Sequence, residues 1–193
     1  MTSESDRISE PLNLAVIVAS VRPGRLGPVV ADWFLDRVAA RGGFSATTLD
    51  LLDFDLPADL TPSPAGEAFA SAIGAADAIV AVTPEYNHGY PASLKTALDS
   101  VKYEWRGKPI GFVSYGGLSG GLRATEQLRQ VVAELHMVSV RDSVGFHRAR
   151  KAFDDLGETT DPAATDASMR MLGQLHWWAA LSARNSAIEH YPG

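Results

Sequence analysis

Between residues 12 and 27 an apolar run breaks off into small, polar and glycine residues, and this transition constrains the fold more than any other stretch. The run reads Leu-Asn-Leu-Ala-Val-Ile-Val-Ala and continues as Ser20-Val-Arg-Pro-Gly-Arg-Leu-Gly27. A short apolar run of this kind, followed by a helical pattern, predicts a buried strand, a turn and a helix N-terminus. The first backbone N–H groups of a helix lack partners within it and carry part of its positive end. The stretch therefore predicts an anion site, suited above all to phosphate.

Three polar side chains strengthen the prediction of a phosphate site in this turn. Ser20 can donate a hydroxyl hydrogen bond, and Arg22 and Arg25 carry positive charge in a forked geometry that suits phosphate oxygens. A hydrogen bond to a charged group contributes about 1.5–3 kcal/mol and a helix terminus about 0.3–1 kcal/mol, so convergent donors would dominate. Neither Gly-x-x-x-x-Gly-Lys-Ser/Thr nor Gly-x-Gly-x-x-Gly is present, which argues against an ATPase or an ordinary dinucleotide site here. A plain turn with solvated arginines is the alternative.

The composition limits the classes of function. With 193 residues, 46% of them hydrophobic and 21% charged, the chain suits one globular domain, expected over residues 11–190 behind a disordered segment at 1–10. A net charge of −6 without a basic run disfavours nucleic-acid and membrane partners. Because the chain has no cysteine, thiol redox chemistry and iron–sulfur ligation are excluded, and any redox chemistry needs a cofactor. The polar first ten residues and the lack of a long apolar run lead us to expect a cytoplasmic protein without a signal peptide.

Apolar segments of strand and helix type alternate along the chain. After the first strand, further strands are expected at 44–51, 77–83, 108–114 and 137–140. Helices are expected after the first turn up to Gly42-Gly43, and at 65–74, 92–102, 119–134 and 163–188, with loops at 53–64 and 141–161. Five strands that alternate with five helices predict a parallel sheet covered on both sides.

Three polar and glycine-rich stretches each follow a predicted strand, at 20–27, 84–91 and 114–121. Ligands of open parallel sheets bind outside the carboxyl ends of the strands, where the strand order reverses, so these stretches are expected to converge on one rim. In the second stretch Pro84 fixes the backbone and Tyr86 supplies an aromatic face. This rim is the predicted binding site.

Several motifs resemble one known family. These are Ser20-x-Arg22, Pro84-Glu-Tyr-Asn-His-Gly, Pro91-x-x-Leu-Lys-x-Ala-Leu-Asp99, Glu104-Trp-x-Gly-Lys-Pro109 and Gly120-Gly-x-Arg-x-x-x-x-Leu-Arg129. On these motifs the sequence resembles the NADPH-dependent FMN reductase family over nearly the whole domain. The resemblance implies a flavodoxin-like α/β fold, a three-layer sandwich with a five-stranded parallel sheet in the order 2-1-3-4-5 and helices on both faces.

The resemblance also implies the cofactor and the residues around it. FMN would be the cofactor and NADPH or NADH the co-substrate, in a homodimer or homotetramer. The FMN phosphate would be held by Ser20, Arg22 and Arg25, with Leu26 and Gly27 at the helix start. The isoalloxazine edge would meet Pro84, Glu85, Tyr86 and Asn87, and the ring or ribityl chain would be bordered by Ser114, Tyr115, Gly116 and Gly117. The chain departs from the family pattern at Ala19, where many members have glycine, and at Arg25, where many have a hydroxyl residue.

The implied function is an FMN-dependent NAD(P)H oxidoreductase. Hydride would pass from nicotinamide to FMN and on to a small-molecule acceptor such as a quinone, free flavin, azo compound or metal oxyanion. Because the cofactor carries this chemistry, no side chain is assigned a catalytic role. A flavodoxin-type electron carrier and a non-redox nucleotide-binding regulator are the alternatives.

Other chemistry-bearing residues have simpler interpretations. We expect His88 to be a loop or interface histidine rather than a base, and the side chain of Glu85 to brace its loop. Three carboxylates, Asp50, Asp53 and Asp55, lack a histidine partner, and no metal site is expected. Core or subunit contacts are expected for the tryptophans Trp33, Trp105, Trp177 and Trp178.

Overall fold

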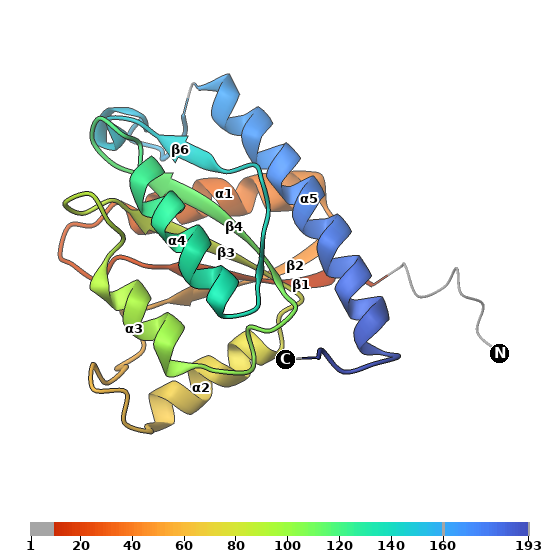
Figure 1. Cartoon of the computed structure of the whole chain (residues 1–193). Coiled ribbons are helices and arrows are strands. Elements are labelled where there is room, and N and C mark those ends of the chain that lie inside the picture. Colours follow the sequence, from red (N-terminus) through yellow and green to blue (C-terminus); the bar gives the residue numbers. More distant parts are fainter. Residues whose placement is uncertain (1–9, 160, 193) are drawn as a thin grey trace.

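The computed structural model describes residues 10–159 and 161–192 (Figure 1). The segment expected to be disordered, residues 1–10, falls outside the described residues except for Glu10, which lies just before the first strand, β1 (Leu12–Val18). The further strands are β2 (Phe44–Asp50), β3 (Ala78–Pro84), β4 (Pro109–Tyr115), β5 (Val138–Ser139) and β6 (Val144–Phe146). The helices are α1 (Gly27–Arg41), α2 (Pro64–Gly74), α3 (Ala92–Ser100), α4 (Leu122–Glu134), the short 3-10 helix η2 (Ala149–Lys151) and α5 (Pro162–Ser186).

The sheet is parallel, with the strand order β2-β1-β3-β4-β5, which confirms the predicted topology. Every residue of β3 and β4 is buried, as expected for central strands that helices cover on both faces. The register pairs Pro84, the last residue of β3, with Tyr115, the last residue of β4. The two strands therefore end at the same level, and their following loops begin side by side.

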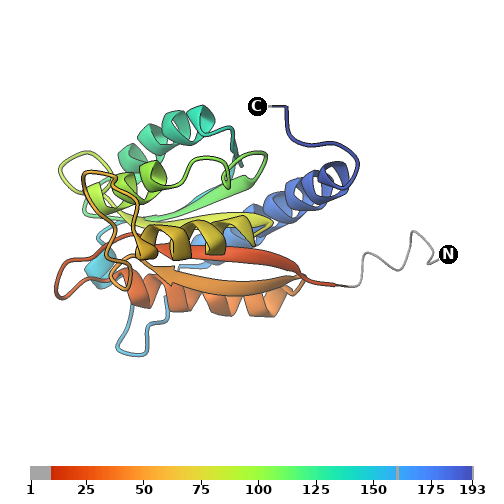
Figure 2. The ribbon, with the colours of Figure 1, turned by 90° about the horizontal axis from the view of Figure 1, so that it is seen from below.

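Helices pack on both faces of the sheet and form two hydrophobic cores. Figures 1 and 2 show α1 and α5 on one face and α2, α3 and α4 on the other. The core under α1 and α5 contains Trp33, and the core on the opposite face contains Trp105. Both indoles are fully buried, which confirms the prediction of core positions for these two tryptophans.

The segment 141–161, expected to be loop, contains β6 and η2, so that prediction is wrong there. Both β5 and β6 pair in parallel with β4: β5 at Pro109 and Ile110, and β6 from Val113 to Tyr115. They form one interrupted edge strand. Three residues, with Val144 and Phe146 buried and Gly145 exposed, are too few for an alternating pattern to be recognised in the sequence.

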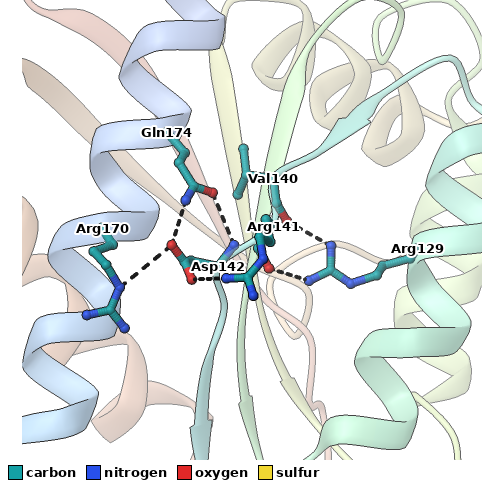
Figure 3. Close-up of polar contacts among 6 residues, drawn as sticks. All are labelled: Arg129, Val140, Arg141, Asp142, Arg170 and Gln174. Atoms are coloured by element: carbon teal, nitrogen blue, oxygen red, sulfur yellow. Dashed lines mark hydrogen bonds and ion pairs between the residues drawn. The ribbon is translucent and has the colours of Figure 1, made fainter.

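Side chains from both helical layers fill the interruption in the edge strand (Figure 3). From α4, Arg129 donates to the carbonyl oxygens of Val140 (2.7 Å) and Arg141 (2.9 Å). From α5, the Gln174 amide nitrogen donates to Asp142 Oδ2 (2.5 Å), and its oxygen accepts from the Asp142 N–H (3.1 Å). Backbone groups that leave the sheet here thus regain partners, as buried or half-buried groups require. The interruption is built into the fold and sets where β6 and η2 lie.

Helix α4 begins later than the expected residue 119 because the two preceding glycines have left-handed backbones. Gly120 and Gly121 have φ angles of 64° and 89°, a region that side chains disfavour. A Cβ on Gly121 would lie only 2.5 Å from Ser114 Cβ and 2.9 Å from the backbone nitrogen of Tyr115. The chain turns into α4 here only because Gly121 has no side chain.

No helix in the described part of the chain is both long and apolar enough to span a membrane.

Gly121→Ala is expected to lower the free energy of unfolding by at least about 2 kcal/mol, because it adds a steric clash to an unfavourable backbone conformation. The matched control is Gly173→Ala in the interior of α5, where a Cβ would meet nothing within 4 Å. That control should gain up to about 1 kcal/mol from helix propensity. Urea unfolding of the three proteins measures both effects, and equal stabilities of the two variants would contradict this description of the turn.

Candidate cofactor site

The three predicted loops meet around one cavity of about 770 Å³ at the carboxyl ends of β1, β3 and β4. This confirms that they converge on one rim of the sheet. The volume lies within the range of about 300–1,000 Å³ that is usual for small-molecule and cofactor sites. The lining residues from the predicted loops are Ser20, Arg22, Arg25, Leu26, Pro84, Glu85, Tyr86, Asn87, Tyr115, Gly116 and Gly117.

The β1–α1 loop offers backbone hydrogen-bond donors to this cavity. Within the described residues, the N–H groups of Arg22, Arg25 and Leu26, which line the cavity, make no backbone hydrogen bond. Helix α1 starts at Gly27 after Leu26, whose side chain cannot cap the first turn. Free amides and an uncapped helix start are the arrangement that binds phosphate in many nucleotide sites. The loop therefore has the donors that the sequence predicted.

Arg25 forms an ion pair with Asp50 of β2 and so does not carry a free charge. Its Nη1 and Nη2 each lie 2.5 Å from an oxygen of Asp50, the last residue of β2, and Nη1 also donates to the Ser20 carbonyl oxygen (2.6 Å). Burial opposes ionisation of Asp50, but the hydrogen bonds and charge of Arg25 outweigh it and hold the pKa of this carboxyl below its usual range. Arg25 thus ties the loop to β2, a role that the sequence did not reveal.

Arg22 and Tyr86 link the first loop to the second. The guanidinium carbon of Arg22 lies 4.8 Å from the centre of the Tyr86 ring, a cation–π contact. The Tyr86 hydroxyl lies 2.5 Å from Ser20 Oγ, which is fully buried. Tyr86 was expected to face the flavin ring, and here its hydroxyl points to the predicted phosphate loop. Within the described residues Arg22 makes no ion pair, so its charge is available to an anion.

A buried hydroxyl group of Tyr115 points to the same place and has no hydrogen bond of good geometry within the described residues. Tyr115 lines the cavity, and a Cβ on Gly27 would lie 3.0 Å from its hydroxyl oxygen. Burial raises the pKa of this phenol, so it remains a proton donor. The Ser20 side chain lies close enough to lower this pKa in part, but a buried donor without a well-aligned partner is still costly. A phosphate or ribityl oxygen would satisfy it, and the donors present therefore fit FMN.

The second loop is held in place from both sides. The Glu85 N–H donates to the Tyr115 carbonyl oxygen (2.9 Å), and the Glu85 carboxylate accepts from Arg123 through its guanidinium (2.5 Å) and its backbone N–H (3.1 Å). Burial raises the pKa of Glu85, but hydrogen bonds from Ser119 and Arg123 bring it below the usual value. Glu85 therefore stays ionised and braces the loop, as the sequence predicted. The turn at Asn87 and His88 has φ angles of 48° and 79°.

Ser114 lies outside the cavity lining, in contrast to the expected contact with the ring or ribityl chain. Its buried hydroxyl donates to the carbonyl oxygens of Gly120 (2.9 Å) and Val144 (3.3 Å). It holds the third loop against β6. In that loop Gly116 and Gly117 do line the cavity, and the Gly116 N–H donates to the Phe146 carbonyl oxygen (3.1 Å).

The segment after β6 supplies a fourth part of the cavity wall that sequence analysis missed. It consists of Arg148, Ala149, Arg150 and Lys151. The only signal in the sequence is three cations within four residues, in a segment assigned to loop. Without the position of β6, nothing placed this segment on the same rim.

The remaining candidates lie elsewhere. The His88 side chain is not among the cavity lining residues, and its carbonyl oxygen accepts from Gln127 (3.1 Å). Trp177 and Trp178 are exposed on α5, beside a separate cavity of about 340 Å³. Asp53 and Asp55 line a third cavity of about 360 Å³. Within the described residues, no three His, Asp or Glu side chains are grouped so as to hold a metal ion.

Together, the parallel sheet, its strand order and the cavity at the strand ends define a flavodoxin-like protein with a cavity of cofactor size at the switch point of the sheet. The sequence profile described as NADPH-dependent FMN reductase matches residues 12–151, most of the chain. The chain therefore belongs to the NADPH-dependent FMN reductase family, a family of oxidoreductases that use FMN and NAD(P)H.

Similar proteins agree with this assignment. An NAD(P)H-dependent FMN reductase of Schizosaccharomyces pombe is 40% identical over 64% of this chain and 67% of its own length. A quinone reductase of Escherichia coli K12 is 29% identical over 87% of this chain and 94% of its own. Among solved structures, the flavoenzyme NAD(P)H:(acceptor) oxidoreductase FerB of Paracoccus denitrificans has a TM-score of 0.71 at 23% identity, covering 89% of this chain and 98% of its own. At that identity the last comparison supports the fold alone.

Asp50→Asn is expected to lower the free energy of unfolding at pH 7 by about 1 kcal/mol, because it removes a charged partner of Arg25. The native pKa of Asp50 is lowered, so its contribution is complete above about pH 4 and is lost as the pH falls through the native value. Denaturant unfolding between pH 7 and pH 3 should thus show the wild-type and variant stabilities converging in acid. Asp55→Asn, an exposed change in the following loop, is the control; a wild-type-to-D50N difference that did not narrow at all below pH 4 would contradict the ion-pair explanation.

Proposed function

We propose that this protein is an FMN-dependent oxidoreductase that oxidises NADPH or NADH and reduces a small-molecule acceptor. The observation that carries the proposal is the convergence of three loops on one cavity of cofactor size, lined by hydrogen-bond donors without partners. The family membership supports the same conclusion. When bound, FMN supplies the hydride chemistry, and the side chains around it bind and orient it.

The first loop is proposed to bind the FMN phosphate. Its donors would be the free amides between Ser20 and Gly27, the guanidinium of Arg22 and the Ser20 hydroxyl, with the Tyr115 hydroxyl added from the end of β4. Charge-assisted bonds to preorganised donors are stronger than neutral ones. Arg25 is proposed to position this loop through Asp50 rather than to contact the phosphate, because both of its terminal nitrogens already bind that carboxylate.

The second and third loops are proposed to hold the flavin ring. The backbone N–H of Asn87 would donate to a polar ring atom, because those of Glu85 and Tyr86 already donate to the carbonyl oxygens of Tyr115 and Gly89. Gly116 and Gly117 would allow the close approach of a flat ring. Because the Glu85 side chain is occupied by Arg123, it would keep the loop in position without taking part in proton transfer. No side chain in this proposal has a catalytic role, in line with hydride chemistry carried by the cofactor.

A quinone is the proposed electron acceptor. The Escherichia coli and Arabidopsis thaliana relatives are named quinone reductase and NADPH:quinone oxidoreductase. Free FMN is a second acceptor to be tested, since three fungal relatives are named FMN reductases. Azo compounds and metal oxyanions complete the panel of small acceptors. The proposed compartment is the cytoplasm, where nicotinamide nucleotides are supplied.

A homodimer or homotetramer is the proposed assembly. Trp177 and Trp178 support it, since 61% and 38% of their surfaces are exposed on α5 and buried tryptophans are common at the centre of protein interfaces. Analytical ultracentrifugation of wild type and Trp177→Ser at micromolar concentration tests the assembly, and a monomeric wild type with full activity would exclude it.

Arg22→Ala is expected to weaken FMN binding about tenfold to a hundredfold, because one charge-assisted contact with phosphate is lost. The unfolding temperature of the cofactor-free protein should change little, since Arg22 is exposed. Fluorescence titration of cofactor-free protein with FMN measures the affinity. Arg184→Ala removes the same charge on the far end of α5 and should bind FMN as the wild type does; unchanged affinity in Arg22→Ala would exclude Arg22 from the phosphate site.

Anaerobic addition of NADPH to the FMN-loaded protein is expected to bleach the visible flavin absorbance rapidly, and a quinone should then restore it. Stopped-flow absorbance measures both steps. Slow bleaching by NADPH together with fast reduction by a protein donor would favour a flavodoxin-type electron carrier. A protein that purifies without colour and does not bind added FMN would favour a non-redox nucleotide-binding regulator.

A further inference from the structure

The cavity has a positively charged wall that the proposed binding of FMN does not use. This wall is the segment Arg148–Lys151, which follows β6 and includes η2. It contributes three cationic side chains, those of Arg148, Arg150 and Lys151. It is separate in sequence from the β1–α1 loop, where the donors proposed for the FMN phosphate lie. We call this segment the basic turn.

The charges of the basic turn are not neutralised by neighbouring carboxylates. Within the described residues, no ion pair or side-chain hydrogen bond involves Arg148, Arg150 or Lys151. Among the cavity lining residues Glu85 is the only acidic one, and it is paired with Arg123. In a chain with a net charge of −6, this cavity mouth is therefore locally positive and attracts anions.

The basic turn is also held rigidly against the third loop. The N–H of Arg148 donates to the Gly117 carbonyl oxygen (2.6 Å) and that of Ala149 to the Gly116 carbonyl oxygen (3.0 Å). Arg148 has a φ angle of 48°, an uncommon conformation for a residue with a side chain. The Ala149 side chain is buried in the core, between two neighbours whose side chains are exposed. The fold thus fixes the backbone of the turn and leaves its cations at the cavity.

We propose that the basic turn binds the 2′-phosphate of NADPH and so makes the protein prefer NADPH to NADH. The proposal rests on the proposed function, in which a nicotinamide nucleotide enters this cavity after FMN. FMN has one phosphate, for which the β1–α1 loop already offers a complete set of donors. NADPH differs from NADH by one additional phosphate with nearly two negative charges, which matches a group of unpaired cations. Arg150 and Lys151, which follow the buried Ala149, are the specificity-determining residues in this proposal.

A direct binding measurement tests the proposal without turnover. Adenosine 2′,5′-bisphosphate carries the distinguishing phosphate, and 5′-AMP does not. Isothermal titration of the wild type, with and without FMN, should give tighter binding of the bisphosphate. In Arg150→Ala/Lys151→Ala its affinity should fall about tenfold, because two charge-assisted contacts at an exposed site are lost. The affinity for 5′-AMP should fall by a smaller factor.

The matched control is Lys102→Ala/Arg184→Ala, which removes the same two charge types from exposed positions. Lys102 lies before β4, at the end of the strand opposite the cavity, and Arg184 lies in the last turn of α5. The affinity of this control for the bisphosphate should stay within about twofold of wild type, which separates a local site from the general effect of net charge. Circular dichroism verifies that both double variants are folded.

Steady-state kinetics of the FMN-loaded enzyme give a second readout. The ratio of kcat/KM for NADPH to that for NADH should fall about tenfold in Arg150→Ala/Lys151→Ala, mainly through KM for NADPH. The proposal is overturned if the wild type does not bind the bisphosphate more tightly than 5′-AMP, if the ratio is unchanged, or if the variant loses FMN affinity instead. Failure of the proposed function looks different: the protein would not bind FMN, while the titration of cofactor-free protein would still report on the basic turn.

Discussion

Backbone hydrogen bonds that continue past the ends of the central strands determine the geometry of the site. The Ala19 N–H donates to Val82 in β3, the Glu85 N–H to Tyr115 in β4, and the Gly116 N–H to Phe146 in β6. Each loop therefore begins next to its neighbour and at the same level along the strand direction. In a parallel sheet all strands run in one direction, so the loops that follow neighbouring strands leave from the same edge. The cavity, its donors and its charged wall all follow from this alignment of the strands.

Charged residues around the cavity fall into two groups with different uses. Arg25 with Asp50 and Glu85 with Arg123 form pairs that connect loops to the scaffold. Arg22 and the basic turn, Arg148–Lys151, have no carboxylate partner in the described part of the chain. Charges in ion pairs hold the loops in position, whereas unpaired positive charges attract anions. An acidic protein can thus bind phosphorylated ligands at one place while the rest of its surface disfavours polyanions.

Most of the fold, and the part of the cavity wall that the three predicted loops form, could be inferred from sequence. The apolar runs of β1, β3 and β4 end abruptly in polar and glycine-rich stretches. This pattern alone shows where each strand ends and that the following loops lie on one rim. The role of Arg25 could not be inferred, since its partner Asp50 is 25 residues away in another strand. The basic turn was missed because β6 has only three residues, too few for a hydrophobic pattern. Its pairing with β4 also leaves no trace in the periodicity of the sequence. The family resemblance implied that Ser114 borders the ring or ribityl chain, but its position at a strand end does not tell which side its hydroxyl faces.

The interrupted edge formed by β5 and β6 also restricts how two copies of this chain can meet. A long, regular edge strand would offer unpaired N–H and C=O groups to a strand of another molecule. Here Arg129 and Gln174 occupy such groups at residues 140–142, and Arg141 and Asp142 place charges at the break. The break at residues 140–142 is therefore closed to pairing with a strand of another molecule. Association of subunits through surfaces away from this break, such as the outer surfaces of the helices, would leave the ends of the strands open to ligands.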